Sequence, residues 1–192
     1  MEKIILASSS PRRKEILKKY KVRYESCKSH IDEKIMPNER PEVVAMGLAF
    51  QKALDIGYKY PHKIILGADT LVVYKNRILG KPKDKKDARE ILNLLSGNIH
   101  EVITGISLIQ MNKGLKVVDY ETTQVKFRNL DDSYIKRYVE TGEPLDKAGA
   151  YGIQDYGALL VEAINGSYLN VVGLPLVKLD ELLIKHFNQA IL

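Results

Sequence analysis

Residues 63–79 read KIILGADTLVVYKNRIL, and the pattern of this stretch indicates the fold class. The apolar run over 63–74 predicts a buried strand, and Lys75-Asn76 predicts the turn of a hairpin into a short strand at 77–79. Strand and helix patterns alternate on both sides of this hairpin. Alternating elements of this kind predict an α/β layered fold, with a central, mixed and twisted sheet and flanking helices.

The other elements follow from periodicity, capping residues and turn signals. Pro41 begins a helix, and Asp84 caps another, with Asp87 at the capping-box position. The remaining expected strands are 3–7, 22–26, 101–110, 117–127 and 158–164. The expected helices are 11–19, 41–57, one that follows Asp84, 131–138 and 175–187, and the stretch 141–157 is expected to be a loop.

Length and composition limit the class of protein. The chain has 192 residues, of which 45% are hydrophobic and 28% charged, as in an ordinary soluble globular protein, and we expect a single domain over 1–192. No apolar run has the length of a membrane span or the form of a signal peptide, so no membrane partner is expected. Cys27 is the only cysteine, which excludes an intramolecular disulfide and fits a reducing cytoplasm.

The charge balance favours anionic ligands. The 30 basic and 24 acidic residues give a net charge of +6 and a pI near 9.2. A lysine-rich surface without a specific partner is the alternative. The sequence lacks metal-finger spacings, aromatic-rich single-strand motifs and an arginine-rich tail, so a dedicated nucleic-acid partner is not expected.

The segment LASSSPRR near the N-terminus departs from the charge rules of helices. Ser10 and Pro11 predict an N-cap and the first position of a helix, yet the next residues are Arg12 and Arg13. Cations are unfavourable at a helix N-terminus, where free N–H groups attract anions. Serine hydroxyls such as that of Ser8, free N–H groups and two guanidinium groups would form a phosphate cradle. A solvated basic turn is the alternative.

Asp69 is the sharpest polar signal in the chain, because it interrupts the apolar strand expected over 63–74. Gly67 and Ala68 before it leave space for a ligand or a kink. A carboxylate in such a place is costly unless it is paired, hydrogen-bonded or bound to a metal. Buried acids at strand ends often act as general bases or metal ligands. The alternative is an aspartate in a bulge that bonds its neighbours.

Two lysines are candidate anion-binding residues. Lys52 lies on the apolar face of the helix that begins at Pro41, so its side chain either extends to water or meets an anion in a site. Lys81 stands between Gly80 and Pro82, which fix the backbone around it, but the segment lacks the spacing of a Walker A lysine.

The loop 147–157 is rich in glycine and carries two side chains suited to a nucleobase. Tyr151 could stack on a base, and the amide of Gln154 can donate and accept a hydrogen bond at the same time. An ordinary glycine-rich connection is the alternative. Elsewhere, Glu33 lies beside Asp32 in a polar loop, where paired acids are usually solvated.

An ordered series of segments covers nearly the whole chain. The segments are LASSSPRR at 6–13, Lys52 in AFQKA, GADT at 67–70, GKP at 80–82, SGNIHEVITG at 96–105, TGEPLDKAGAYGIQ at 141–154 and INGSYLNVVGLPL at 164–176. Each segment alone is weak, but the series together is specific. Through it the chain resembles the Maf family of nucleoside triphosphate pyrophosphatases.

The resemblance implies an α/β fold of two lobes around a cleft, similar to inosine triphosphate pyrophosphatases, and hydrolysis between the α- and β-phosphates. The segment KAGAYGIQ resembles the branch that acts on dTTP and UTP. By the same resemblance Asp69 is the proton acceptor. The resemblance also implies that Arg12, Thr70 and Gln154 determine substrate choice. Asp155 follows Gln154 at a position where that branch commonly has glycine.

The chemistry of the residues agrees with this reaction. Arg12, Arg13, Lys52 and Lys81 would offset the negative charge of a triphosphate and of its transition state. Asp69 would orient or deprotonate the water that attacks the α-phosphorus.

We expect a divalent cation at the site, Mg²⁺ first and Mn²⁺ second, because Mg²⁺ binds through few carboxylates together with substrate phosphates. Asp69 and Glu33 are the acids expected beside it. The expected partner is the nucleoside triphosphate, with a homodimer left open, and the sequence does not separate common from modified pyrimidines. The alternatives are a broader or 7-methyl-GTP-type pyrophosphatase, and a non-catalytic nucleotide- or RNA-binding module linked to cell division. A pure phosphate binder, however, gains nothing from a carboxylate at Asp69.

Overall fold

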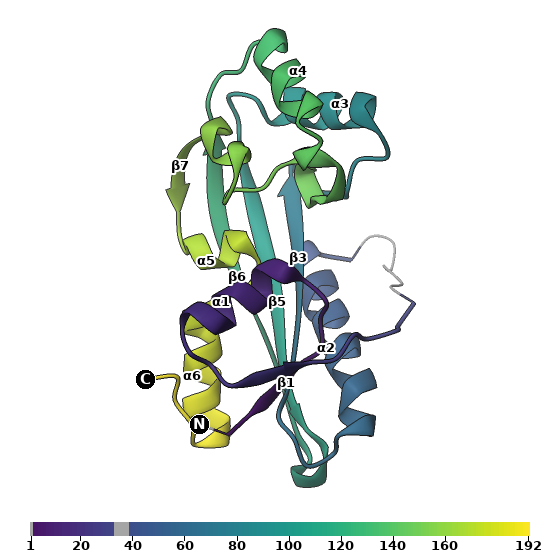
Figure 1. Cartoon of the computed structure of the whole chain (residues 1–192), viewed down its shortest axis with the longest axis vertical. Helices are drawn as coiled ribbons and strands as arrows, with labels where there is room; N and C mark the ends of the chain where they lie inside the picture. Colours follow the sequence, from purple (N-terminus) through teal and green to yellow (C-terminus); the bar gives the residue numbers. More distant parts are fainter. Residues whose placement is uncertain (1, 33–38) are drawn as a thin grey trace. The chain divides into compact units, whose positions relative to one another are not determined.

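The computed structural model describes residues 2–32 and 39–192. In these residues seven strands form one sheet, in the order β2-β1-β3-β5-β6-β7 with β4 paired to β3 (Figure 1). β1 is parallel to β2 and β3, whereas the β3–β4 and β6–β7 pairs are antiparallel, so the expected α/β fold with a mixed sheet is confirmed. The strands are β1 (Ile4–Leu6), β2 (Tyr24–Ser26), β3 (Ile65–Tyr74), β4 (Arg77–Leu79), β5 (Ile99–Gln110), β6 (Leu115–Phe127) and β7 (Val161–Asn165).

Helices and short 3₁₀ turns connect the strands. The helices are α1 (Pro11–Lys19), α2 (Pro41–Lys59), α3 (Lys85–Leu95), α4 (Asp132–Glu140), α5 (Tyr168–Val172) and α6 (Leu176–Phe187). The 3₁₀ turns are η1 (Met111–Lys113), η2 (Glu143–Asp146), η3 (Ala148–Ala150) and η4 (Tyr156–Leu160). In the described ranges no helix combines the length and the apolar character that crossing a bilayer requires.

The hairpin and the helix cap form where the sequence predicts them. Lys75 and Asn76 have φ values of 48° and 60°, as a two-residue hairpin turn between right-twisted strands requires. At the start of α3 the side chain of Asp84 accepts the N–H of Asp87 at 2.8 Å. Local turn and capping chemistry therefore sets these boundaries.

Predictions for the C-terminal third differ from the structure in detail. β7 begins at Val161, later than expected, because residues 158–160 belong to η4, where the N–H of Ala158 bonds the carbonyl of Asp155. The expected loop over 141–157 contains η2, η3 and the start of η4. α5 is too short to show the periodicity that reveals longer helices.

The chain divides into two compact units. Unit 1 comprises Met1–Asp69, Thr104–Glu121 and Gly173–Leu192, and unit 2 comprises Thr70–Ile103 and Thr122–Val172. The chain passes from one unit to the other within β3, β5 and β6, and again between Val172 and Gly173. Each unit is described by itself below.

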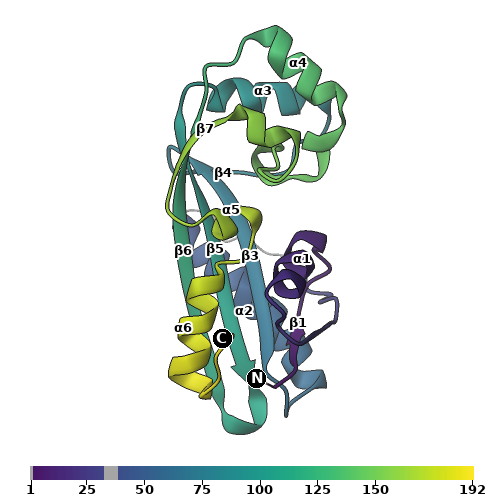
Figure 2. The same cartoon turned by 60° about the vertical axis from the view of Figure 1, so that its left-hand side comes forward.

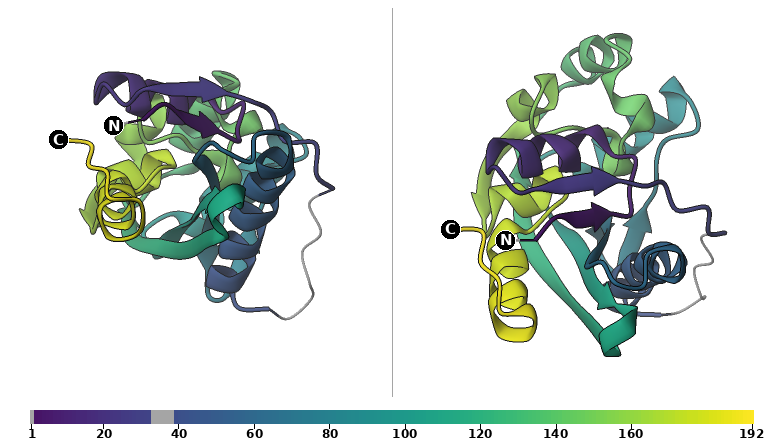
Figure 3. Two further views of the ribbon diagram at one scale, coloured as in Figure 1. Left: turned by 90° about the horizontal axis from the view of Figure 1, so that it is seen from below. Right: turned by 60° about the horizontal axis from the view of Figure 1, so that its bottom comes forward.

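Unit 1 contains the parallel strands β1 and β2 together with α1, α2 and α6. Figure 3 shows α2 and α6 on either side of the β5–β6 hairpin end. One buried cluster joins β1, α2, β3 and β5. Its fully or nearly fully buried members are Ile5, Ala7, Ala53, Ile56, Ile65 and Ile109.

In unit 2, α3 packs against α4 (Figure 2). Unit 2 also contains an aromatic cluster of Phe127, His100 and Tyr151, all buried. The ring of Phe127 meets the other two edge-on, with centroids 4.9 Å from His100 and 4.8 Å from Tyr151. Such edge-to-face contacts stabilise a core beyond the area that they bury.

Candidate active site

The turn between β1 and α1 is built by its serines. The Oγ of Ser10 accepts the N–H of Arg13 and caps α1, as the Ser10-Pro11 pair predicts. The Oγ of Ser8 accepts the N–H of Ser10 at 3.1 Å and a guanidinium N–H of Arg13 at 3.2 Å. The first turn of α1 holds no acidic residue, so no carboxylate of that turn offsets the partial positive charge at the helix N-terminus.

Arg13 anchors this turn to a distant segment of unit 1. Its Nε donates to the carbonyl of Gly173 at 2.8 Å, while its Nη1 donates to Ser8. Arg12, in the same turn, is half-buried. The structure therefore brings Ser8, Ser10 and Arg13 into one hydrogen-bonded turn, with Arg12 beside them in sequence. Their contacts with phosphate stay a prediction.

Lys52 and Asp69 form an ion pair inside unit 1. The Nζ of Lys52, on α2, lies 2.5 Å from Oδ1 of Asp69, in β3. Both side chains are largely buried, with exposed fractions of 14% and 13%. The ammonium of Lys52 therefore meets a carboxylate of the protein itself, and its contact with a substrate anion stays a prediction. The ion pair compensates the charge that Asp69 brings into an apolar strand.

Glycines on two strands let α2 lie close to the sheet of unit 1. A Cβ at Gly67, in β3, would lie 2.1 Å from the carbonyl oxygen of Ala49. A Cβ at Gly105, in β5, would lie 2.2 Å from that of Ala45. Both distances are far below van der Waals contact, so α2 rests on the strand backbones themselves. This close approach brings the lysine within reach of the carboxylate.

Three more of the predicted site residues belong to unit 2. Thr70 lies half-buried in the middle of β3. Lys81 and Gln154 are exposed, the first just after β4 and the second in the turn before η4. The N–H of Gly149 donates to the carbonyl of Gly80 at 3.1 Å. This bond joins the segment of Lys81 to the loop of Gln154.

Close packing fixes the glycine-rich loop of unit 2. Gly149 has a φ of 68°, and a Cβ there would lie 2.7 Å from Cγ1 of Val72. Gly152 packs on the buried stem of Lys147, where a Cβ would lie 2.5 Å from Cε. Gly149 therefore requires glycine for its conformation and for space, whereas a Cβ at Gly152 would require the stem of Lys147 to move.

Tyr151 is not available to stack on a base, so that expectation is wrong. The residue is 6% exposed, and its Oη lies 2.8 Å from Nε2 of His100 in the aromatic cluster. Burial lowers the pKa of His100 to about 4 and raises the pKa of Tyr151, so both are neutral at pH 7. The aromatic ring gains more from the apolar interior of unit 2 than from solvent.

Glu33, expected beside the metal, lies outside the described residues. Within 2–32 and 39–192 no three His, Cys, Asp or Glu side chains gather in a way that could hold a metal ion. Asp69 alone still offers a hard oxygen donor. Mg²⁺ commonly binds through one or two carboxylates and completes its shell with water and substrate phosphates. The donor chemistry of Asp69 therefore fits a divalent cation.

Two supporting residues are absent from the sequence-based set. Gly173 holds Arg13 through its carbonyl, and Glu143 accepts two backbone N–H groups just after Gln154. Both lie in segments of the ordered series, GLP and TGEP. Glycine and proline in both segments predict turns, but no local pattern shows which distant group Gly173 or Glu143 binds.

Comparison with known proteins covers almost the entire chain. The profile of the family described as Maf-like protein matches residues 3–186. A relative named dTTP/UTP pyrophosphatase from Clostridioides difficile (strain 630) is 52% identical over 185 residues, which is 96% of this chain and 95% of the relative. A protein of the same name from Alkaliphilus metalliredigens (strain QYMF) is 50% identical over 193 residues, which is 100% of both chains. Among solved structures, the Staphylococcus aureus Ham1 protein aligns with a TM-score of 0.42 and 14% identity, over 66% of this chain and 72% of that one.

Proposed function

This chain belongs to the family of Maf-like proteins, and on that premise we propose that it hydrolyses dTTP and UTP to the nucleoside monophosphate and pyrophosphate. The name that its full-length relatives bear supports this substrate class. The observation that carries the proposal is the largely buried ion pair of Lys52 and Asp69, in the same unit as the basic β1–α1 turn. A carboxylate held in this way serves hydrolysis, whereas it would only repel a phosphate that is merely bound.

The β1–α1 turn binds the phosphates in this proposal. The hydroxyls of Ser8 and Ser10 supply O–H donors, the positive end of α1 attracts the anion, and the guanidinium group of Arg12 supplies charge and a bidentate fork. Arg13 keeps the turn in place through Gly173 and adds positive charge. The cations that break the charge rule at this helix are then balanced by the triphosphate.

Asp69 accepts the proton of the water that attacks the α-phosphorus. The new bond joins the water oxygen to the α-phosphorus, the bond from that phosphorus to the bridging oxygen breaks, and pyrophosphate leaves. Lys52 holds the carboxylate in one orientation and offsets charge that develops on the phosphate oxygens. Lys81 offsets charge on the phosphates as a further cation.

Asp69 is also the described residue that would hold a divalent cation, with Glu33 as the second acid of the proposal. When bound, such a cation supplies Lewis-acid polarisation of the phosphate. The proposal places the reaction in the cytoplasm, because a lone cysteine fits a reducing compartment.

Gln154 reads the base. Uracil and thymine present an N–H donor flanked by two carbonyl acceptors, and a primary amide can pair with a donor and an acceptor side by side. Cytosine replaces one of these acceptors by a donor and lacks the N–H, so an amide held in the orientation that suits uracil faces mismatched groups and CTP is hydrolysed poorly. The 5-methyl group of thymine is neither required nor excluded.

A nucleotide panel in H₂¹⁸O tests the reaction and its substrate together. The panel holds dTTP, UTP, CTP, GTP, 7-methyl-GTP and 5-modified UTP with Mg²⁺, and mass spectrometry reads the monophosphate and the pyrophosphate. We expect turnover of dTTP and UTP, with the ¹⁸O label in the monophosphate, because water attacks the α-phosphorus.

The other outcomes each contradict a defined part of the proposal. Label in pyrophosphate would mean attack at the β-phosphorus. Faster turnover of GTP or 7-methyl-GTP would identify a different substrate branch. Tight binding of UTP by calorimetry without any turnover would identify a non-catalytic nucleotide-binding module.

A further inference from the structure

Gln154 stands on a tight turn of unit 2. The N–H of Asp155 bonds the carbonyl of Gly152 at 3.4 Å and closes this turn, and η4 follows it. Gln154, Asp155 and Tyr156 are all exposed. The backbone sets where the Cα–Cβ bond of Gln154 points, so whatever fixes this turn also sets the position from which the amide reaches a base.

The side chains of Tyr138 and Glu143 form hydrogen bonds with backbone groups before and after Gln154. The Oη of Tyr138, in α4, donates to Oε1 of Glu143 at 2.8 Å and accepts the N–H of Gly152 at 3.4 Å. The carboxylate of Glu143, at the start of η2, accepts the N–H of Tyr156 at 2.9 Å and that of Gly157 at 3.0 Å. One connected pair of side chains therefore binds both ends of the turn.

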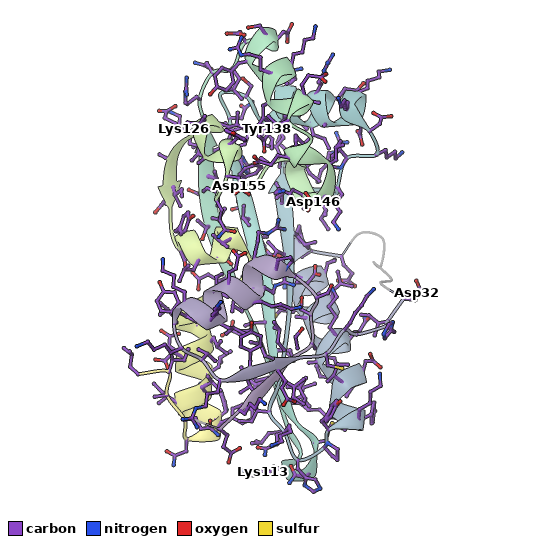
Figure 4. All side chains as sticks on the ribbon, viewed as in Figure 1. Asp32, Lys113, Lys126, Tyr138, Asp146 and Asp155 are labelled. Atoms are coloured by element: carbon purple, nitrogen blue, oxygen red, sulfur yellow. The ribbon has the colours of Figure 1, made fainter. Side chains whose placement is uncertain are left out.

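Burial and charge make this pair rigid. Tyr138 is 4% exposed, and burial together with the nearby carboxylate raises its pKa, so the hydroxyl stays a proton donor. The ionised Glu143 is a stronger acceptor than a neutral group would be. Gly157 packs closely against this turn: a Cβ there would lie 2.5 Å from the carbonyl oxygen of Gly152 and 2.8 Å from Oη of Tyr138. Figure 4 shows Tyr138 and Asp155 in this same part of unit 2.

We propose that Tyr138 and Glu143 are positioning residues for base recognition. They hold the turn so that the amide of Gln154 keeps the direction that pairing with uracil or thymine requires. This inference rests on the proposed function and deepens it, because it assigns specificity to two residues through Gln154 and not through contact with substrate. A merely structural role would change stability and leave the choice of base unchanged.

Tyr138→Phe and Glu143→Gln test the proposal with minimal changes of shape. The first removes the hydroxyl that links both ends of the turn, and the second replaces the charged acceptor by a weaker, one-oxygen acceptor. We expect each to lower the ratio of kcat/KM for UTP over that for CTP about tenfold, chiefly through a higher KM for UTP. We expect kcat for UTP to change less than about threefold, because Lys52 and Asp69 are untouched. Glu143→Asp, which keeps the charge, should retain part of the preference.

Matched controls come from the same helix. Glu140 pairs at the surface with Lys85 and Arg89, and the ring of Tyr134 makes cation–π contacts with Arg128 and Arg137. Glu140→Gln and Tyr134→Phe should therefore keep the wild-type preference for UTP over CTP. If they lower it as much as the test variants do, the preference follows general stability of unit 2 and the proposal is wrong. Melting temperatures of all variants accompany the kinetics.

A double-mutant cycle separates this inference from the function on which it rests. With Gln154→Ala as background, neither test variant should alter the base preference further. If Gln154→Ala itself leaves the preference intact, the proposed base reading fails, and the positioning role fails with it. If Gln154→Ala abolishes the preference while Tyr138→Phe and Glu143→Gln preserve it, the positioning role alone is overturned.

Discussion

A carboxylate in an apolar strand is stable only when another group compensates its charge, and in this protein Lys52 does so for Asp69. The same contact serves stability and chemistry, because the ammonium group of Lys52 both compensates the charge of the carboxylate and orients it. Arg12 and Arg13 have different roles in the β1–α1 turn. Arg13 bonds the protein itself, whereas Arg12 is the arginine that we assign to the substrate.

This division predicts different results for the two arginines. Arg13→Ala should lower the free energy of unfolding by about 1–3 kcal/mol, because the carbonyl of Gly173 and the Oγ of Ser8 lose a charged donor. Arg12→Ala should leave stability unchanged or raise it by about 0.3–1 kcal/mol, because a cation leaves the positive end of α1. Turnover of every triphosphate should nevertheless fall, and Arg12→Lys should restore only part. Thermal melts beside kinetics check this; two variants that behave alike in both measurements would contradict it.

His100 predicts a pH dependence of stability at the residue scale. Burial lowers its pKa to about 4 from 6.5, and within the described residues its Nδ1 has no hydrogen-bond partner. Below pH 6.5 the unfolded chain binds a proton that the folded chain does not take up until about pH 4. Stability of order 3 kcal/mol is therefore present above pH 6.5 and lost as the pH falls through this window.

Chemical denaturation between pH 4 and pH 7.5 measures this effect. His100→Gln keeps a donor or acceptor for Tyr151 but cannot titrate, so its stability should fall less steeply with acid than that of the wild type. His62→Gln changes an exposed histidine and should follow the wild type. Parallel pH profiles for wild type and His100→Gln would refute the assignment.

At the scale of elements, the contact of α2 with β3 and β5 sets the geometry of the catalytic pair. Gly67 and Gly105 have no side chains, so the helix approaches to the strand backbones. Helix–sheet contacts built on branched side chains keep the backbones farther apart. A longer distance would leave the lysine short of the carboxylate.

Gly67→Ala should therefore separate the pair. Its Cβ would meet the carbonyl oxygen of Ala49 at 2.1 Å and the Cβ of Ala53 at 2.9 Å, and relief requires a shift of α2. We expect a loss of about 1–3 kcal/mol of stability, as for overpacking of a core, together with a fall in kcat of about 100-fold from the displaced pair.

Gly47→Ala is the matched control, because Gly47 lies on α2 with open space at its Cβ position. This change should stabilise the helix by about 1 kcal/mol and leave turnover unchanged. Full activity in a folded Gly67→Ala protein would show that the close approach of α2 does not matter for catalysis.

Across the whole molecule, the sequence predicted elements that depend on neighbouring residues, but it did not predict contacts between residues far apart in the chain. Alternation, caps and turn residues predicted β1, α1, α2 and the β3–β4 hairpin, because these depend on neighbours in the chain. The bond from Arg13 to Gly173 joins residues 160 positions apart, and no local pattern contains it. The burial of Tyr151 was missed for the same reason, since its partner His100 lies on β5, 51 positions earlier in the chain.

The candidate site was predictable in part. An acid in an apolar strand and a lysine on an apolar helix face marked Asp69 and Lys52 as exceptions, and exceptions to packing rules often belong to functional sites. Their pairing needed the structure. The Tyr138–Glu143 pair broke no local rule, so only its hydrogen bonds reveal it.

In the proposed reaction Asp69, held by Lys52, is the base for hydrolysis, and Asp69→Asn is the sharpest test of that role. The change keeps the shape and removes the proton acceptor and its charge. With UTP and Mg²⁺ we expect kcat to fall by about two to four orders of magnitude, the usual effect of losing a general base, while calorimetric affinity for the substrate stays equal or rises. Asp119→Asn, which alters the more exposed pair of Asp119 with Lys178 in the same unit, should keep wild-type kcat. A folded Asp69→Asn protein that turns over UTP at near the wild-type rate would contradict the account.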